Sequence, residues 1–414
     1  MKKITLLCSL FIAISINAHA YDGNIYVAFQ EYSRGDFSAA VSDFKPLAES
    51  GDASSQYYIG LMNLNGQGLP KDEKQAFQWF EKSAKQGYAK AQNALGEMYY
   101  HARGTRRDED QALFWFRKAA NKGLAVAQRN LAVMYAYAVV PHDYKKAVFW
   151  LKRAARQGDD IDQLMLARIY YHQAEVQDNA KSAYWMRKAA NQGLAEAQYL
   201  LGNYYYSGQG VPQGYDKALY WYKRAYSQGY VEAPYSIGLM YVHGKGVPYD
   251  HAIAVQWFCS AANLGNHNGI YQLRTASDKE AIDCLTELAK QGQTLAQEEL
   301  GVFYENNTVD AHGYHEYALA AFWYRKAAEQ GYAGAFNHLG DLYAIGNGVP
   351  KDPVIAEMLY ILARSKMYYG ALYSSRIREE LSDSQKSEAQ SLAKSWKVGT
   401  PLPERSETGN MPKQ

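Results

Sequence analysis

The sequence contains little cysteine, little proline and almost no net charge. Three Cys and 11 Pro occur among 414 residues, and 44 Lys and Arg face 42 Asp and Glu. One of the three Cys, Cys8, lies in the N-terminal apolar segment. The remaining two are too few for a scaffold that is held together mainly by disulfides. A chain without excess positive charge gives no bulk electrostatic reason to bind nucleic acid or an anionic membrane.

Long apolar runs are also missing, except near the start of the chain. Ile4–Ile16 is apolar, follows Lys2 and Lys3, and precedes Ala18-His19-Ala20. A basic start, a short apolar run and a small-x-small site are typical of a secretory signal peptide. The alternative is a membrane anchor, but the run is too short to span a bilayer. We therefore expect cleavage of residues 1–20 after Ala20, and a periplasmic or secreted mature chain without a transmembrane segment.

Tryptophan and glycine, by contrast, recur at regular intervals. Seven of the eight Trp share one register, with intervals of 35 or 36 residues up to Trp257 and one of 66 before Trp323. The glycines that close each unit keep the same spacing over most of the chain. The positions concerned are Trp79, Trp115, Trp150, Trp185, Trp221, Trp257 and Trp323, with Gly51, Gly87, Gly123, Gly158, Gly193, Gly229, Gly265, Gly292, Gly331 and Gly370. A repeat of this length predicts stacked supersecondary units, none of which can bury its apolar face alone.

Leu201–Tyr230 shows one complete unit. Small and apolar residues recur at helical spacing on both sides of a break at Gly208–Pro212, and Gly229 follows the second periodic run. Glycine just past a periodic run, and a Gly-x-Gly pair followed by proline, are helix-stop and turn signals. The unit is therefore predicted to be helix–loop–helix, and the fold class all-α.

Three motifs recur in register: Ala-Gln-x-x-Leu-Gly-x-x-Tyr, Gly-x-Gly-Val-Pro-x-Asp, and Ala-x-x-Trp-Tyr-x-Lys-Ala-Ala-x-x-Gly. Their clearest copies are Ala91–Gly123, Ala197–Gly229, Ala233–Gly265 and Ala335–Gly370. In these motifs the chain resembles the Sel1-like repeat family of the exported bacterial type, a relative of the tetratricopeptide repeat. The resemblance implies an α/α superhelical solenoid that serves as an interaction scaffold, but it names no partner.

The repeat divides the chain into five segments. We expect a signal peptide over 1–20, an atypical N-terminal capping helix pair over 21–52, and the repeat array over 53–370, irregular at 266–317. A C-terminal capping helix over 371–397 and a disordered tail over 398–414 complete the prediction. Terminal units of a solenoid are atypical because one of their sides faces water.

The Trp positions and one stripe of the first helices are predicted to form the core. A second stripe on the same helices faces away from the second helices. Tetratricopeptide-type superhelices line their concave side with first helices, so the resemblance implies a tyrosine-rich groove. Tyrosine offers a large contact area at little entropic cost, which suits binding of a protein or peptide. The alternative is that tyrosine is simply tolerated on half-exposed helix faces. The groove residues are Tyr57, Asn93, Tyr100, His101, Arg129, Tyr137, Tyr171, His172, Tyr199, Tyr206, Tyr235 and His243.

Cys259 and Cys284 lie on second helices of successive units. In an oxidising compartment they form a candidate disulfide. The alternative is two buried free thiols that are too far apart to be joined.

Catalysis is the other function class to consider. Cysteine-rich exported relatives have been described as penicillin-binding proteins or weak β-lactamases, which would need a Ser-x-x-Lys with supporting Lys-Thr-Gly and Ser-Asp-Asn elements. Ser42–Lys45 and Ser391–Lys394 fit the first string, but no Lys-Thr-Gly occurs. We therefore predict no enzyme, no cofactor and no metal site. The predicted function is an exported scaffold for protein or peptide binding in cell-envelope processes or host interaction, with a cell-wall or β-lactam-binding protein as the alternative.

Overall fold

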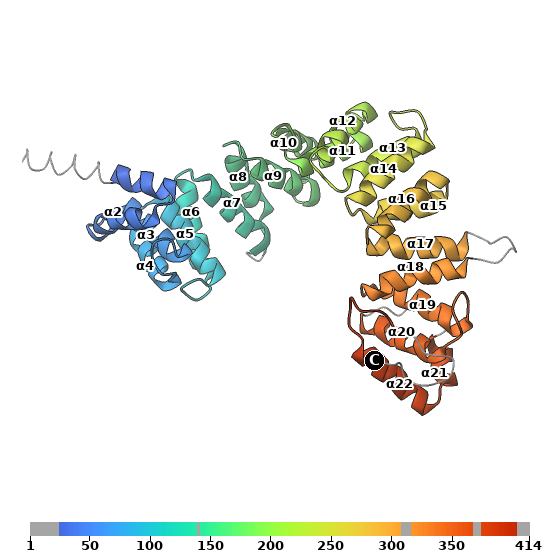
Figure 1. Cartoon of the computed structure of the whole chain (residues 1–414). Coiled ribbons are helices and arrows are strands. Elements are labelled where there is room, and N and C mark those ends of the chain that lie inside the picture. The colour runs from blue at the N-terminus through green and yellow to red at the C-terminus, as the bar shows by residue number, and fades with distance from the viewer. Residues whose placement is uncertain (1–24, 139–140, 308–315, 367–373, 404–414) are drawn as a thin grey trace, which may run out of the picture. The chain divides into compact units, whose positions relative to one another are not determined.

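The computed structural model describes residues 25–138, 141–307, 316–366 and 374–403, and every regular element in these ranges is helical (Figure 1). Helices alternate as the first and second members of antiparallel pairs, which confirms the predicted all-α array. The first helices are α3 (Ala53–Asn65), α5 (Ala89–His101), α7 (Ala125–Val133), α9 (Asp160–His172), α11 (Ala195–Ser207), α13 (Ala233–His243), α15 (His267–Ala276), α17 (Thr294–Asn306) and α19 (Ala333–Ile345). The second helices are α4 (Glu73–Lys85), α6 (Glu109–Asn121), α8 (Tyr144–Ala155), α10 (Asn179–Asn191), α12 (Tyr215–Tyr226), α14 (His251–Asn263), α16 (Lys279–Lys290), α18 (Tyr317–Glu329) and α20 (Pro353–Ser365).

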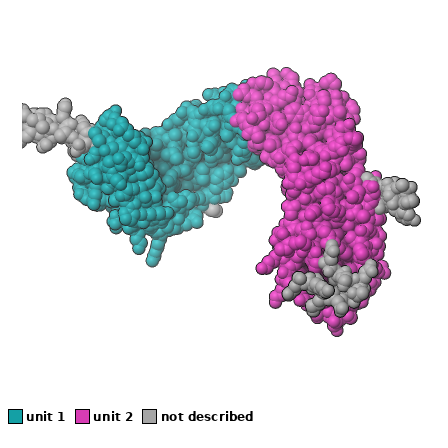
Figure 2. Space-filling model, in the orientation of Figure 1, with its two compact units in different colours: residues 1–197, 209–211 teal, residues 198–208, 212–414 magenta. Residues whose placement is uncertain are grey.

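The pairs form two compact units (Figure 2). Unit 1 comprises residues 1–197 with 209–211, and unit 2 comprises residues 198–208 with 212–414. Before the first pair, residues 25–34 are helical and are followed by α2 (Phe37–Glu49). After the last pair come α21 (Ser374–Glu380) and α22 (Asp383–Ser395). The predicted signal peptide and its cleavage site at Ala20 lie outside the described residues.

Turn chemistry starts the second helices where the sequence predicts it. The carboxylate of Asp72 accepts a hydrogen bond from the backbone N–H of Gln75 at 2.9 Å, and Asp352 caps α20 in the same way. An aspartate at this position satisfies amide groups that have no partner within the helix. Gly210 shows why the loop needs glycine: its φ is +71°, and a Cβ there would lie 2.1 Å from the carbonyl oxygen of Asn179.

A glycine–aromatic contact joins the two helices in most of the pairs. A Cβ atom on Gly96 of α5 would lie 2.7 Å from ring carbons of Phe116 on α6. The absence of that Cβ allows the ring to lie on the helix backbone. The same contact recurs as Gly60 with Phe80, Gly202 with Tyr222, Gly238 with Phe258, Gly301 with Tyr324, and Gly340 with Tyr360. In the two units where alanine replaces the glycine, at Ala132 and Ala167, the second-helix residue is the buried Leu151 or Met186 instead.

This pairing predicts a specific rescue. Gly96→Ala should be destabilising, because overpacking costs about 1–3 kcal/mol and the gain of about 1 kcal/mol in helix propensity offsets only part of that cost. Adding Phe116→Leu should recover stability, with a coupling energy of at least about 0.5 kcal/mol in a double-mutant cycle measured by urea unfolding.

The control for this cycle combines Gly96→Ala with Phe258→Leu, whose ring packs on Gly238 in the other unit. These two changes should be additive within about 0.5 kcal/mol because their sites are independent. Additivity in the Gly96 and Phe116 pair as well would contradict the proposed fit.

A glutamine ladder joins successive helix pairs. Gln163, buried at the start of α9, donates to the carbonyl of Ala155 at 3.2 Å and accepts from Gln192 at 3.0 Å. Buried amides of this kind are costly unless they are bonded. The carboxamide pair recurs as Gln86 with Gln56, Gln157 with Gln128, Gln228 with Gln198, and Gln330 with Gln297.

The tryptophans form part of the core, though not uniformly. Trp115, Trp150, Trp185 and Trp221 are buried, whereas Trp79, Trp257 and Trp323 are half-buried. In the neighbouring stripe predicted on the first helices, the position that runs from Met62 in α3 to Leu342 in α19 is buried in each repeat, and the next position, which includes Tyr99, is buried or half-buried. The indoles therefore pack at the margin of the core and the first-helix stripe at its centre.

The C-terminal segment corrects one predicted boundary. Disorder was predicted from residue 398, but residues 398–403 contact the C-terminal end of α18. Leu402 is 5% exposed, its N–H donates to the Glu329 carboxylate at 3.3 Å, and the Gly399 N–H donates to the Glu329 carbonyl at 2.7 Å. We call residues 398–403 the Leu402 strap, because the buried side chain of Leu402 anchors them. An isolated apolar residue of this kind has no periodic pattern from which an ordered segment could be predicted. Residues 404–414 lie outside the described part of the chain.

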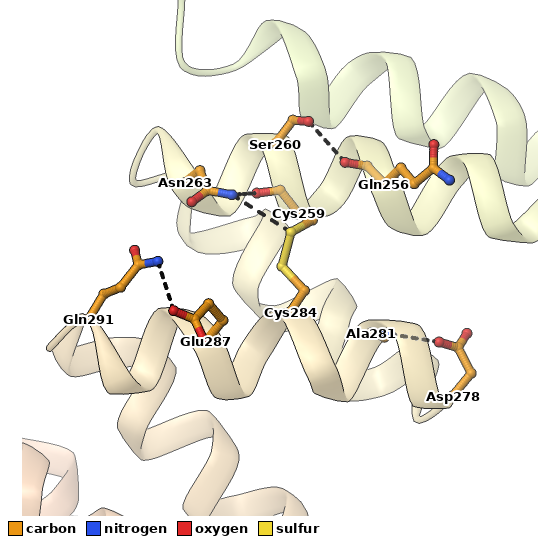
Figure 3. The surroundings of a disulfide bond; sticks show 9 residues. All are labelled: Gln256, Cys259, Ser260, Asn263, Asp278, Ala281, Cys284, Glu287 and Gln291. Atoms are coloured by element: carbon orange, nitrogen blue, oxygen red, sulfur yellow. Dashed lines mark hydrogen bonds between the residues drawn. A yellow bond between two sulfur atoms is a disulfide. The ribbon is translucent and has the colours of Figure 1, made fainter.

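The irregular region contains a shortened helix pair, α15 and α16, which is tied to α14. Cys259 of α14 and Cys284 of α16 are joined by a disulfide, with their Cα atoms 6.2 Å apart (Figure 3). Asn263 donates to the Cys259 carbonyl at 2.9 Å, one helical turn away. The crosslink fastens the pair that lacks both the tryptophan and the long loop of the other units.

Candidate binding surface

The predicted groove residues divide into two rows in the structure. The first row occupies the last turns of the first helices. Tyr100, Tyr171 and Tyr206 are half-buried there. His101, His172 and His243 beside them are exposed. Each of these helices therefore offers a hydroxyl, an imidazole or both at one end, next to the loop of its own unit.

Tyr137 extends this row by a different route. It lies in a π-helical turn, Met134–Ala138, which follows α7, and its side chain is exposed. A π turn inserts an extra residue and so changes the direction of the side chains that follow. No pattern in the sequence indicates this turn.

The second row lies in the middle of the first helices, and some of its side chains pack against the core. Tyr57, Tyr199 and Tyr235 are half-buried, and their rings lie 5.6 to 5.9 Å from the second-helix aromatic rings that contact the glycines. Burial is also the main cause that raises the pKa of Tyr57 above its usual range. These tyrosines support the helix pairs and are only partly exposed to solvent.

Asn93 requires a correction. It is 6% exposed, donates to Glu97 at 2.8 Å, and accepts from Asn130 of the next first helix at 3.0 Å. An amide whose bonds are made inside the fold is not free to bind a partner. The structure therefore assigns Asn93 to a hydrogen bond between α5 and α7, which the periodicity within α5 does not indicate.

Arg129 has a similar linking role. Its guanidinium pairs with Asp159 at 2.9 Å and with the buried Asp162 of α9. Burial raises the pKa of Asp162, while Arg129 acts in the opposite direction. The ion pair joins two consecutive first helices and leaves Arg129 half-buried.

A further surface row on the second helices was not predicted from the sequence. The residue before the tryptophan is an exposed aromatic in five units, and a lysine or arginine four positions later lies over its ring. The signal in the sequence that could have revealed this row is a Phe or Tyr directly before the tryptophan, followed by a Lys or Arg four positions later. The pairs are Phe114 with Lys118, Phe149 with Arg153, Tyr184 with Lys188, Tyr220 with Arg224, and Phe322 with Lys326.

The catalytic alternative gains no geometric support. The Ser42 hydroxyl donates to the carbonyl of Ser38, four residues earlier on the exposed surface of α2. Ser391 lies on the surface of α22. A nucleophilic serine needs a base within hydrogen-bond reach, and no such contact involves either serine in the described chain.

The described ranges contain neither a metal-binding cluster nor a membrane-spanning helix. No group of three His, Cys, Asp or Glu side chains there is arranged to hold a metal ion. His312 and His315, which the sequence places close to Asp310 and Glu316, lie outside those ranges. Among the described helices, none combines the length and the apolar composition needed to cross a bilayer.

Comparisons with known proteins agree with the repeat pattern. A family model described as Sel1 repeat matches residues 53–88, 89–124, 125–159, 162–194, 195–230, 231–266, 294–332 and 337–366. The unmatched stretch between 266 and 294 contains the shortened pair. No curated protein matches the chain.

Two solved structures are similar along most of their length. One is a protective antigen present in uropathogenic Escherichia coli strains that displays an SLR fold, with 28% identity, a TM-score of 0.61, and coverage of 92% of this chain and 93% of that one. The other is a Sel1 repeat protein from Oxalobacter formigenes, with 29% identity, a TM-score of 0.55, and coverage of 83% and 90%.

Proposed function

The chain belongs to the Sel1 repeat family, and from this premise we propose that it is an exported scaffold that binds a protein or peptide through the tyrosine-rich row of its first helices. The signal-like residues 1–20 support a periplasmic or secreted location. The disulfide between Cys259 and Cys284 suits such an oxidising compartment. The likeness to a protective antigen of uropathogenic Escherichia coli supports a role in the cell envelope or in contact with a host.

The observation that carries this proposal is the row of half-buried tyrosines and exposed histidines at the ends of the first helices. Tyr100, Tyr171 and Tyr206 each expose part of a large ring held by a rigid helix. Such side chains lose little entropy on binding, and their hydroxyls can bond to peptide groups.

The proposal predicts that the triple change Tyr100→Ser, Tyr171→Ser and Tyr206→Ser abolishes partner capture while thermal stability stays nearly intact. The measurement is an affinity pull-down from envelope extract with quantitative mass spectrometry, accompanied by thermal unfolding of both proteins. A partner lost only in this variant would support the proposal.

A matched control changes the same number of tyrosines elsewhere. Tyr26, Tyr220 and Tyr249 are exposed and lie outside the first-helix row, so their change to Ser should leave capture unaffected. Equal loss of capture in both triple variants would count against a specific surface. A collapse of stability in the first variant would mean that these tyrosines belong to the core.

A further inference from the structure

The second helices α8 and α10 of unit 1 contain no carboxylate. α8 contains Lys145, Lys146, Lys152 and Arg153, and α10 contains Lys181, Arg187 and Lys188. Together with α9 these helices enclose a cleft of about 340 Å³, whose lining includes Lys152, Arg156, Lys181, Tyr184, Trp185 and Lys188 and no acidic residue. Four cations thus face one small space in a chain that is nearly neutral as a whole.

The acidic residues nearby neutralise only one end of this pair of helices. Asp143 pairs with Lys146 at 2.9 Å, Glu175 with Lys145 at 3.4 Å, and Asp178 with Lys181 at 2.7 Å. All three pairs involve the first turn of a second helix or the loop before it. Asp159 and Asp162, on the α9 side, are engaged by Arg129.

The cations at the other end of the helices lack such partners. Lys152 and Arg156 form no ion pair within the described part of the chain, and the Lys188 ammonium lies 5.5 Å from the ring centroid of Tyr184. The cleft lining therefore carries three positive charges that form no ion pair in the described chain. Ligand anions are attracted to such a site because low-dielectric walls strengthen the local potential.

We propose that this basic cleft binds a small phosphorylated molecule. A phosphomonoester carries between one and two negative charges at neutral pH and has three acceptor oxygens, so it can engage several cations at once. Arginine binds phosphate in a bidentate manner and lysine as a point charge. A monocarboxylate would leave two of the three charges unbalanced.

The remaining cleft walls indicate an organic group attached to the phosphate. The cleft volume lies in the lower range of small-molecule pockets, which is about 300–1,000 Å³. Tyr184 is 52% exposed and stands at the cleft with the buried Trp185 beside it. A ring of the size of a sugar can pack against this aromatic wall while its phosphate reaches Lys152 and Arg156.

The preceding helix pair, α5 and α6, argues against a long polyanion such as a nucleic acid as the ligand. At the positions equivalent to Lys152 and Arg156, α6 has Arg117 and Asn121. The Arg117 guanidinium donates to the Tyr135 hydroxyl at 2.9 Å, and Asn121 is uncharged. The pair of cations is therefore not repeated at the equivalent positions of α6, so the site suits a ligand of limited size.

Isothermal titration of the purified mature chain with glucose 6-phosphate at low ionic strength tests the proposal, with glucose and inorganic phosphate as comparison probes. We expect saturable one-site binding of glucose 6-phosphate that is tighter than binding of either part alone. The double variant Lys152→Glu and Arg156→Glu should weaken it at least about tenfold. Absence of saturable binding, or equal binding of inorganic phosphate, would overturn the proposal.

A charge-matched control separates the cleft from general electrostatics. Lys74→Glu and Lys90→Glu change the net charge by the same amount at exposed positions of unit 1 outside the cleft, and should alter affinity less than about twofold. Loss of affinity in this control equal to that in the cleft variant would overturn the proposal. If the cleft variant fails to fold, Lys188→Gln with circular dichroism as a folding check provides the same comparison.

A second arm identifies the source of the phosphate. Vesicles of phosphatidylcholine with phosphatidic acid present the phosphomonoester as a lipid headgroup, whereas glucose 6-phosphate presents it in solution. Vesicle binding that the double variant loses and glucose 6-phosphate displaces would support the site with a lipid source. Binding of glucose 6-phosphate without vesicle binding would support it with a soluble source.

Discussion

Replacing Trp115 by Ala should lower the free energy of unfolding by about 3–5 kcal/mol, the usual cost of removing a buried tryptophan. Trp115 is 8% exposed and belongs to the core cluster that includes Phe80, Leu95 and Met98. Its indole N–H has no hydrogen-bond partner in the described chain, so the loss would come from packing and cavity formation. Equilibrium unfolding in guanidinium chloride would measure the change.

The adjacent residue provides a matched control. Phe114 is 46% exposed and lies on the same helix, with Lys118 over its ring. Phe114→Ala should cost less than about 1 kcal/mol because an exposed cation–π pair is worth about 0.5–1 kcal/mol. A loss below about 1 kcal/mol for Trp115→Ala, or equal losses for both variants, would show that the indole row is not core.

Removing the disulfide should have the second largest effect. Cys259 and Cys284 are separated by 25 residues. Closing a loop of this length restricts the unfolded chain and typically stabilises a protein by about 2–4 kcal/mol. The double variant Cys259→Ser and Cys284→Ser should therefore unfold at a lower denaturant concentration than the oxidised protein.

Reducing agent distinguishes the crosslink from the change of side chain. The oxidised protein should lose stability when the reductant tris(2-carboxyethyl)phosphine is added, whereas the serine variant should show no response. An oxidised protein whose unfolding midpoint does not move on reduction would contradict a stabilising role for the bond.

The repeat architecture could be predicted from the sequence because the residues that define it cannot be exchanged freely. Tryptophan at a fixed interval and glycine after each second helix mark positions where size or positive φ decides the local structure. The caps at Asp72 and Asp352 follow from the same local chemistry. The caps and glycines act locally and the tryptophan interval recurs along a single chain, so one sequence is enough to reveal them.

Features that depend on contacts between successive helix pairs were harder to predict. Asn93 lies on the expected face, yet its amide bonds to Asn130 of the next first helix, which only the spacing of neighbouring helices decides. The Leu402 strap and the π turn at Tyr137 also lack a periodic signature. The basic cleft was hidden by the overall charge, because acidic residues elsewhere balance the cations of α8 and α10.

The glycine–aromatic contact limits how such a chain can evolve by duplication. A copied helix pair keeps a well-packed core only if both of its helices are copied together. A first helix with the glycine packs against a Phe or Tyr of the second helix, whereas a first helix with the alanine packs against a Leu or Met. Recombination within a pair, between one that has the glycine and one that has the alanine, would join mismatched halves and leave either a void or a clash. Crossovers between pairs preserve each match, so gain and loss of whole modules is the route by which the array can change its length.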